Sequence, residues 1–164
     1  MIVVVMGVAG SGKTTISRLL AQTMECSFLE GDSLHSDANV AKMSQGLPLT
    51  DADRGPWLAA VHAEVRKAFV RGEDLVVACS ALKQAYRALL AGGIPVTWVH
   101  LDAPADIIRA RLEHRTGHFM KANMLSSQIE ALERPADAIA VDASQEPAAI
   151  VEEILARLRL RTDC

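Results

Sequence analysis

The feature that most constrains this chain is a phosphate-binding loop that directly follows a short apolar run. Residues 7–14 read Gly-Val-Ala-Gly-Ser-Gly-Lys-Thr, the complete G-x-x-x-x-G-K-[ST] pattern, and residues 2–6 read Ile-Val-Val-Val-Met. In such a loop the backbone N–H groups surround a polyphosphate, the lysine reaches its terminal phosphates, and the final hydroxyl can ligate Mg²⁺. The apolar residues from Ile16 to Met24 have helical spacing, and a helix N-terminus favours the same anion. The sequence therefore predicts a strand, loop and helix that bind a nucleoside triphosphate.

Length and composition exclude several other classes of protein. The 164 residues are enough for about one domain, so we expect a single domain over residues 1–164. A net charge of −3 and an aromatic content of 4% argue against a nucleic-acid surface and favour a small-molecule substrate. No stretch approaches the roughly 20 apolar residues of a membrane helix, and the apolar start continues into the loop, unlike a signal peptide. The three cysteines lack C-x-x-C spacing, which predicts a reducing, cytoplasmic environment and no zinc site.

Strand-like apolar runs alternate with helix-periodic segments along the chain. The runs are residues 2–6, 27–29, 75–79, 96–101 and 138–141. This alternation predicts an α/β fold with a five-stranded parallel sheet, and the runs of consecutive Val, Ile and Leu predict helices on both faces, as in a three-layer sandwich. Thr50 and Asp53 form a capping-box pattern for a helix that runs to Gly72.

Polar and charged residues follow the predicted strands, where a parallel sheet holds its ligands. Glu30-Gly31-Asp32-Ser33-Leu34-His35 follows the second strand, and Asp32 is expected to face the γ-phosphate. Ser80-Ala81-Leu82-Lys83 follows the third strand, with Arg87 one helical turn beyond Lys83. Each feature has an alternative interpretation, because Asp32 could be a turn or cap residue and Lys83 with Arg87 could form a solvated helix face. Their occurrence after successive strands favours a site.

In this order, several segments resemble the gluconokinase family of small P-loop kinases over nearly the whole chain. They are residues 7–14, 30–35, 39–43, 46–58, 79–83, 86–87, 115–120 and 127–128. The resemblance implies the fold of the shikimate- and nucleoside-monophosphate-type kinases, with a mobile lid at about residues 115–127, and it implies a homodimer. It also implies transfer of the γ-phosphate of ATP to the 6-hydroxyl of D-gluconate, giving 6-phospho-D-gluconate and ADP.

Phosphoryl transfer requires positioning and charge neutralisation, and the expected roles follow from that requirement. We expect Lys13, Asp32 and Arg115 to be catalytic, as phosphate cation, base and lid cation, with Arg111 as the alternative lid cation. The residues expected to bind ATP are Gly7, Ala9, Gly10, Ser11, Gly12, Lys13, Thr14, Thr15 and Arg111. The residues expected to bind the substrate are Asp32, His35, Arg54, Lys83, Arg87 and His118.

Some of these assignments leave alternatives open. Arg54 or Arg87 would engage the substrate carboxylate, and Lys83 could serve either substrate or phosphate. His35 and His118 could each donate to a sugar hydroxyl or serve as local hydrogen-bonding groups.

The third strand ends in Cys79-Ser80, without the aspartate that commonly completes magnesium binding. Asp32 is therefore expected to serve Mg²⁺, together with Thr14, as well as the base role. Residues 142–147 are expected near adenine from their location alone. Two other functions remain as alternatives: a P-loop kinase for another small hydroxy acid or a nucleotide, and a non-catalytic nucleotide-binding module.

Overall fold

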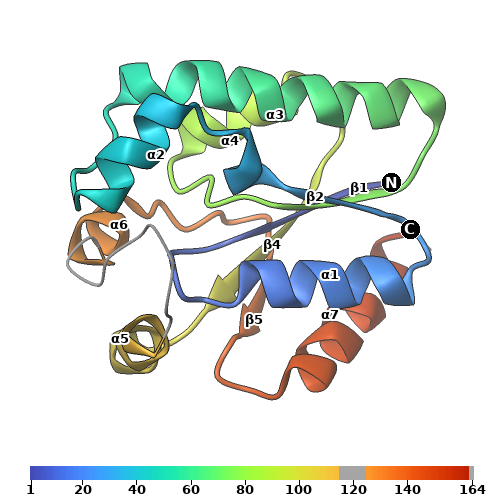
Figure 1. Cartoon of the computed structure of the whole chain (residues 1–164). Helices are drawn as coiled ribbons and strands as arrows, with labels where there is room; N and C mark the ends of the chain where they lie inside the picture. Colours follow the sequence, from blue (N-terminus) through green and yellow to red (C-terminus); the bar gives the residue numbers. More distant parts are fainter. Residues whose placement is uncertain (115–124, 163–164) are drawn as a thin grey trace.

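A five-stranded parallel sheet forms the middle layer of the structure, a computed structural model that describes residues 1–114 and 125–162 (Figure 1). The elements are β1 (Ile2–Met6), α1 (Lys13–Thr23), β2 (Ser27–Glu30), η1 (Gly31–Leu34), α2 (Asp37–Ser44), α3 (Asp51–Arg71), β3 (Leu75–Ala78), α4 (Gln84–Ala91), β4 (Thr97–Asp102), α5 (Ala105–Glu113), α6 (Leu125–Ala131), β5 (Ile139–Asp142) and α7 (Pro147–Thr162). The strand order is β2-β3-β1-β4-β5, and every pair is parallel.

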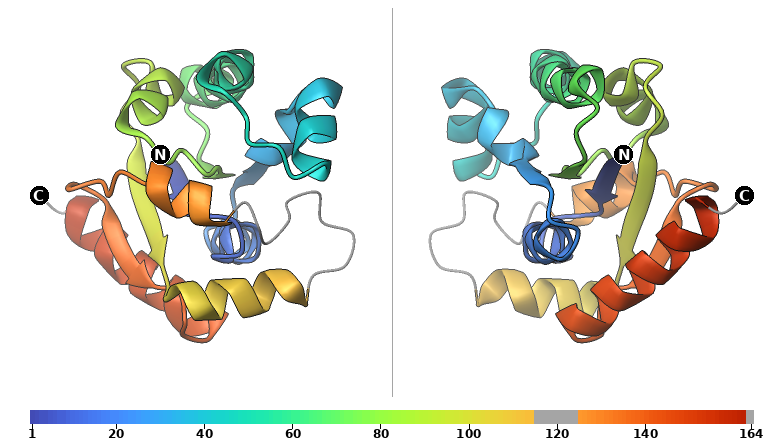
Figure 2. Two further views of the ribbon diagram at one scale, coloured as in Figure 1. Left: turned by 90° about the vertical axis from the view of Figure 1, so that its left-hand side faces the viewer. Right: turned by 90° about the vertical axis from the view of Figure 1, so that its right-hand side faces the viewer.

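Helices cover both faces of the sheet, which confirms the three-layer α/β fold. Helices α3 and α4 lie on one face and α1 and α7 on the other (Figure 1). Helices α2, α5 and α6 lie around the carboxyl ends of the strands (Figure 2). Among the described helices, none has the length and apolar character needed to cross a membrane.

Alternate side chains of β1 enter two separate cores. Ile2, Val4 and Met6 pack under α3 and α4, whereas Val3 and Val5 pack against α1 and α7. All five are at most 3% exposed. A strand buried on both faces must be apolar at every position, which explains the uninterrupted run that identified β1 in the sequence.

The predicted strands are confirmed, with ends that shift by one residue. The helix predicted from the capping box is also confirmed: Thr50 caps α3, Asp53 completes the box, and Gly72 ends the helix in the left-handed conformation. The sequence placed residues 125–127 in a polar lid, but they form the first turn of α6, and Leu125 is 2% exposed. Leu125 packs with Val8, Leu112 and neighbouring apolar residues. The polar composition of the preceding segment gave no indication of this buried contact.

An ion pair joins α2 to the start of α3. The Lys42 ammonium lies 3.0 and 2.9 Å from the two carboxylate oxygens of Asp53, which also accept the backbone N–H of Thr50. The Lys42 side chain, followed by the backbone of Thr50, lowers the pKa of Asp53 from 3.8 to about 2. The carboxylate therefore contributes to folding stability only while it is charged.

We expect Asp53→Asn to destabilise the fold at neutral pH and to have a smaller effect in acid. Because the folded pKa lies below the unfolded value, the contribution is present above the unfolded pKa and is lost as the pH falls toward about 2. Urea unfolding of both proteins at pH 7 and at pH 3 measures the difference. Asp37→Asn, which removes an exposed carboxylate from α2, is the control. A difference between Asp53→Asn and wild type that is equal at both pH values would contradict this account.

Candidate active site

The phosphate loop connects β1 to α1 and takes a conformation that depends on glycine. Gly10 has φ +80°, and a Cβ there would lie 2.9 Å from Leu112 Cγ and 3.1 Å from the Ile108 carbonyl oxygen of α5. The loop closes on the Val8 carbonyl, which accepts the Ser11 N–H at 3.2 Å and the Lys13 ammonium at 3.0 Å. The loop is therefore packed on α5, and its own side chain and backbone donors converge on the Val8 carbonyl.

The first helical turn after the loop meets the end of β2. The Thr14 hydroxyl donates to a carboxylate oxygen of Glu30 at 2.6 Å. Sequence reasoning assigned Thr14 to the metal and gave Glu30 no role, although Glu30 directly precedes the Gly31-Asp32 turn. The signal that could have found it is its position as the last residue of a strand next to the loop.

The turn after β2 lies close against β3. Gly31 is buried, and a Cβ there would lie 2.6 Å from the Ala78 carbonyl oxygen. The Trp57 indole N–H donates to the Gly31 carbonyl at 2.8 Å, which ties the turn to α3. Only glycine allows this approach. The next residue, Asp32, lines a pocket of about 230 Å³ that is called the central pocket here.

His35 is enclosed between this turn and α3. Its ring stacks on Trp57 with centroids 4.1 Å apart, and its side chain is 4% exposed. Its Nε2 lies 4.0 Å from a carboxylate oxygen of Asp32, and its Nδ1 lies 3.3 Å from the Asn39 amide nitrogen. Burial lowers the pKa of His35, against the opposing effect of Asp32. At neutral pH the ring is therefore an uncharged group packed beside the Asp32 carboxylate.

The opposite wall of the pocket carries cations from α3 and from the turn after β3. Arg54 donates to the Leu49 carbonyl at 2.6 Å and to the Tyr86 hydroxyl at 3.2 Å. Asp51 accepts hydrogen bonds from the Tyr86 hydroxyl and from the Lys83 ammonium, the latter at 3.2 Å. The hydrogen bond to Asp51, followed by the interaction with Tyr86, raises the pKa of Lys83, so its ammonium is positively charged at neutral pH.

Arg87, unlike Arg54, does not reach the pocket. The residue is 8% exposed, and its guanidinium donates to the carbonyls of Ala81 and Leu82 at 3.1 and 3.0 Å. Ala81 has φ +40°, a strained conformation for a residue with a Cβ. Arg87 thus holds the turn after β3 in shape and is absent from the lining of the central pocket.

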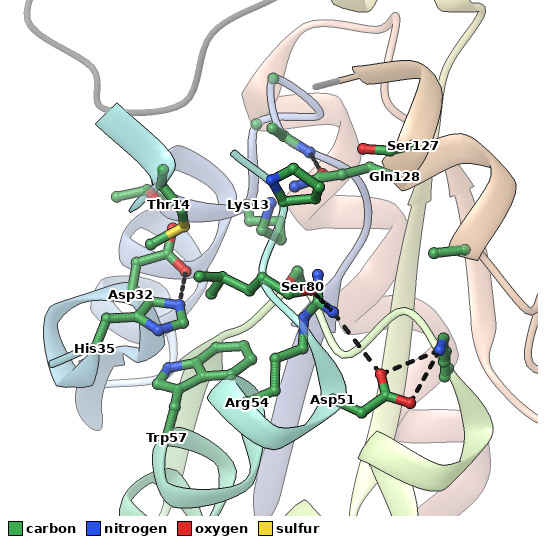
Figure 3. A pocket seen from close by; sticks show the side chains of 18 residues that line it. Lys13, Thr14, Asp32, His35, Asp51, Arg54, Trp57, Ser80, Ser127 and Gln128 are labelled. Atoms are coloured by element: carbon green, nitrogen blue, oxygen red, sulfur yellow. Dashed lines mark hydrogen bonds and ion pairs between the residues drawn. The ribbon is translucent and has the colours of Figure 1, made fainter. Parts of the chain in front are cut away.

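Figure 3 shows the side chains that line the central pocket. The pocket brings together nine of the predicted site residues: Ala9, Gly10, Gly12, Lys13, Thr14, Asp32, His35, Arg54 and Lys83. Ser127 and Gln128 of α6 also line it. Sequence reasoning gave these two residues no role, although both belong to the last segment of the resemblance.

A second pocket, called the side pocket here, lies on the other side of the phosphate loop. It measures about 590 Å³ and is lined by residues that include Thr15, Arg111, Gln145 and Pro147. Arg111 donates to the Ala143 carbonyl at 2.8 Å, which joins α5 to the segment after β5. The predicted cofactor residues Thr15 and Arg111 and the segment predicted near adenine therefore share one cavity. Arg115 and His118 lie outside the described residues.

Comparison with known proteins identifies the relatives of this chain. Residues 2–139 match the family described as an AAA domain, so the chain belongs to that broad family. The gluconokinase of Gluconobacter oxydans is 47% identical over 156 residues, which cover 93% of this chain and 88% of that protein. The chain belongs to the gluconokinase family. A crystal structure of a gluconokinase from Sinorhizobium meliloti agrees, with a TM-score of 0.88, 42% identity, and coverage of 99% of this chain and 93% of that one.

A more distant structure confirms the fold expected for the gluconokinase family. Shikimate kinase from Aquifex aeolicus superposes with a TM-score of 0.65 at 18% identity, covering 99% of this chain and 98% of that one. The predicted shikimate-kinase-type architecture is therefore confirmed.

We expect Arg87→Met to lower stability, because it removes both hydrogen bonds to the strained turn. Leaving buried carbonyls without a donor costs roughly 1–3 kcal/mol. Urea unfolding measures the change. The exposed Arg66→Met in α3 is the control. An unfolding midpoint equal to that of wild type would show that the turn does not depend on Arg87.

Proposed function

We propose that this protein transfers the γ-phosphate of ATP to the 6-hydroxyl of D-gluconate, giving 6-phospho-D-gluconate and ADP. The observation that carries the proposal is the central pocket, in which a phosphate-loop lysine, a carboxylate and an arginine lie around one cavity in a gluconokinase-family chain. Phosphoryl transfer needs this combination: cations for the moving phosphate, a carboxylate for the attacking hydroxyl, and a binding group for the acceptor.

The two pockets suggest how the substrates divide the site. The nucleotide base would occupy the side pocket between α5 and the segment after β5, with its phosphates along residues 7–15. Lys13 would then exchange the Val8 carbonyl for the β- and γ-phosphates. The acceptor would lie in the central pocket, on the far side of the loop, in line for transfer.

The residues near Thr14 fit a magnesium ion. Thr14 and Glu30 already lie within hydrogen-bond distance, and Asp32 lines the adjacent pocket. In the described part of the chain, no three His, Cys, Asp or Glu residues form a metal cluster. The carboxylates of Glu30 and Asp32 suit Mg²⁺, because it binds through one or two carboxylates and otherwise through water and substrate phosphates. When bound, it would neutralise charge on the phosphates; Thr14, Asp32 and Glu30 would hold it.

In the central pocket, Asp32 and Arg54 would have separate roles toward the acceptor. Asp32 would accept the proton of the 6-hydroxyl, beside the uncharged His35 ring that packs against it. Arg54 would bind the gluconate carboxylate, since its planar fork matches two carboxylate oxygens. Lys83, on the same wall of the pocket, would support it. The roles of Arg115 and His118, the closure of a lid and a homodimer remain predictions.

A coupled ADP-release assay with a panel of acceptors tests the function. We expect gluconate to stimulate ADP release, and Lys13→Met to abolish it because the cation on the transferring phosphate is lost. Other hydroxy acids, neutral sugars and nucleosides in the panel test the alternative kinases. ADP release that no acceptor stimulates would indicate a nucleotide-binding module instead.

We expect Asp32→Asn to lower the single-turnover rate by about 100-fold, the usual scale for loss of a positioned base. Binding of a non-hydrolysable ATP analogue should change little, because the base acts on the acceptor. Rapid-quench single-turnover measurements with gluconate check the rate. A wild-type rate in a folded Asp32→Asn protein would remove Asp32 from the chemistry.

We expect Arg54→Ala to raise the gluconate KM by about 10- to 150-fold, the scale of a hydrogen bond to a charged group. The exposed Arg66→Met in α3 is the control, and its gluconate KM should stay within about twofold of wild type. Steady-state kinetics at a temperature where all three proteins are folded make the comparison. Equal gluconate KM values in wild type and Arg54→Ala would place the carboxylate elsewhere.

A further inference from the structure

One peptide unit of the phosphate loop is held at both of its ends. The carbonyl of the Val8–Ala9 peptide accepts the Lys13 ammonium and the Ser11 N–H. The N–H of the same peptide belongs to Ala9 and donates to the Gln128 side-chain oxygen at 2.7 Å. Because a peptide is planar, fixing its N–H also fixes the direction of its carbonyl. Gln128 therefore controls the direction of the oxygen on which Lys13 rests.

Gln128 reaches the loop from a firmly packed helix. It is 8% exposed although polar, and Leu125, one turn earlier in α6, is 2% exposed in the cluster that contains Val8 and Ala9. Glu133, just beyond α6, donates its N–H to the Leu82 carbonyl at 2.9 Å and accepts the Gln84 N–H at 2.6 Å. These contacts join α6 to the turn after β3 and to the start of α4. Figure 3 shows Gln128 extending from α6 toward the phosphate loop.

We propose that Gln128 is a positioning residue of the phosphate loop: it orients the Val8–Ala9 peptide and, through it, Lys13, and so couples α6 to the nucleotide site. The inference rests on the proposed phosphoryl transfer for its kinetic consequence, but not for its structural one. When Lys13 leaves the Val8 carbonyl for the phosphates, the hydrogen bond from Gln128 keeps the peptide from rotating. The loop then keeps the shape that directs its N–H groups to the nucleotide.

Gln128→Leu is the main test, because leucine has nearly the same size and lacks the acceptor. We expect hydrogen exchange of the Ala9 amide in the free protein, measured by NMR, to become faster. We also expect weaker binding of a non-hydrolysable ATP analogue by about 5- to 150-fold, the scale of an unpaired buried donor. With gluconate as acceptor, kcat should fall, because the phosphate loop positions the phosphate that is transferred.

Three further variants make the test decisive. Gln128→Glu keeps an acceptor at the same chain length and should restore slow exchange at Ala9. Glu130→Leu, on the exposed side of α6, should leave Ala9 exchange and analogue binding unchanged. If Gln128→Leu does not fold, Gln128→Asn, whose shorter side chain cannot reach Ala9, takes its place. Wild-type Ala9 exchange and wild-type analogue affinity in a folded Gln128→Leu or Gln128→Asn protein would overturn the proposal. Analogue binding requires no acceptor, so its outcome is independent of whether gluconate is the substrate.

Discussion

Parallel pairing of β2, β3 and β1 places the turns that carry the polar groups of the pocket side by side. Glu30 and Val5 both pair with Ala78, so the three neighbouring strands end at one level. The chain then leaves each strand as a turn, and each turn delivers a different group: a phosphate loop, a carboxylate and a cation. If the register of β2 slipped by one residue, Glu30 would face away from Thr14, because successive strand side chains point to opposite faces.

The turns that leave the strands are short, and buried side chains hold them in place. Trp57 bonds to the Gly31 carbonyl, Arg87 to the carbonyls around Ala81, and Gln128 to the Ala9 N–H. Each is a buried polar group whose hydrogen bond satisfies the backbone of a turn that belongs to no regular ladder. The active-site geometry thus depends on side chains that hydrogen-bond to the backbone of these turns. This rigid frame suits a reaction whose catalysis is mostly positioning.

The strands, the phosphate loop and the long helix after Thr50 could be predicted because local patterns specify them. Apolar runs identify strands buried on both faces, and the capping box identifies the start of α3. The roles of Arg54 and Arg87 could not be separated, because both are arginines near expected site segments. Only packing reveals that Arg87 turns toward backbone carbonyls while Arg54 lines the pocket. Glu30 and Gln128 were missed for a related reason: their partners, Thr14 and Ala9, are 16 and 119 residues away.

The central and side pockets share only Gly10 and Gly12 among their described lining residues. The partition between the two cavities is therefore made of backbone without side chains. The side pocket is built mainly from α5 and the segment after β5, whereas the central pocket is built mainly from η1, α3, α6 and the turn after β3. Apart from the two glycines, a substitution in the lining of one pocket therefore changes no lining residue of the other. In evolution, such a chain can exchange one phosphate acceptor for another by altering η1 and α3 while its nucleotide chemistry is inherited unchanged.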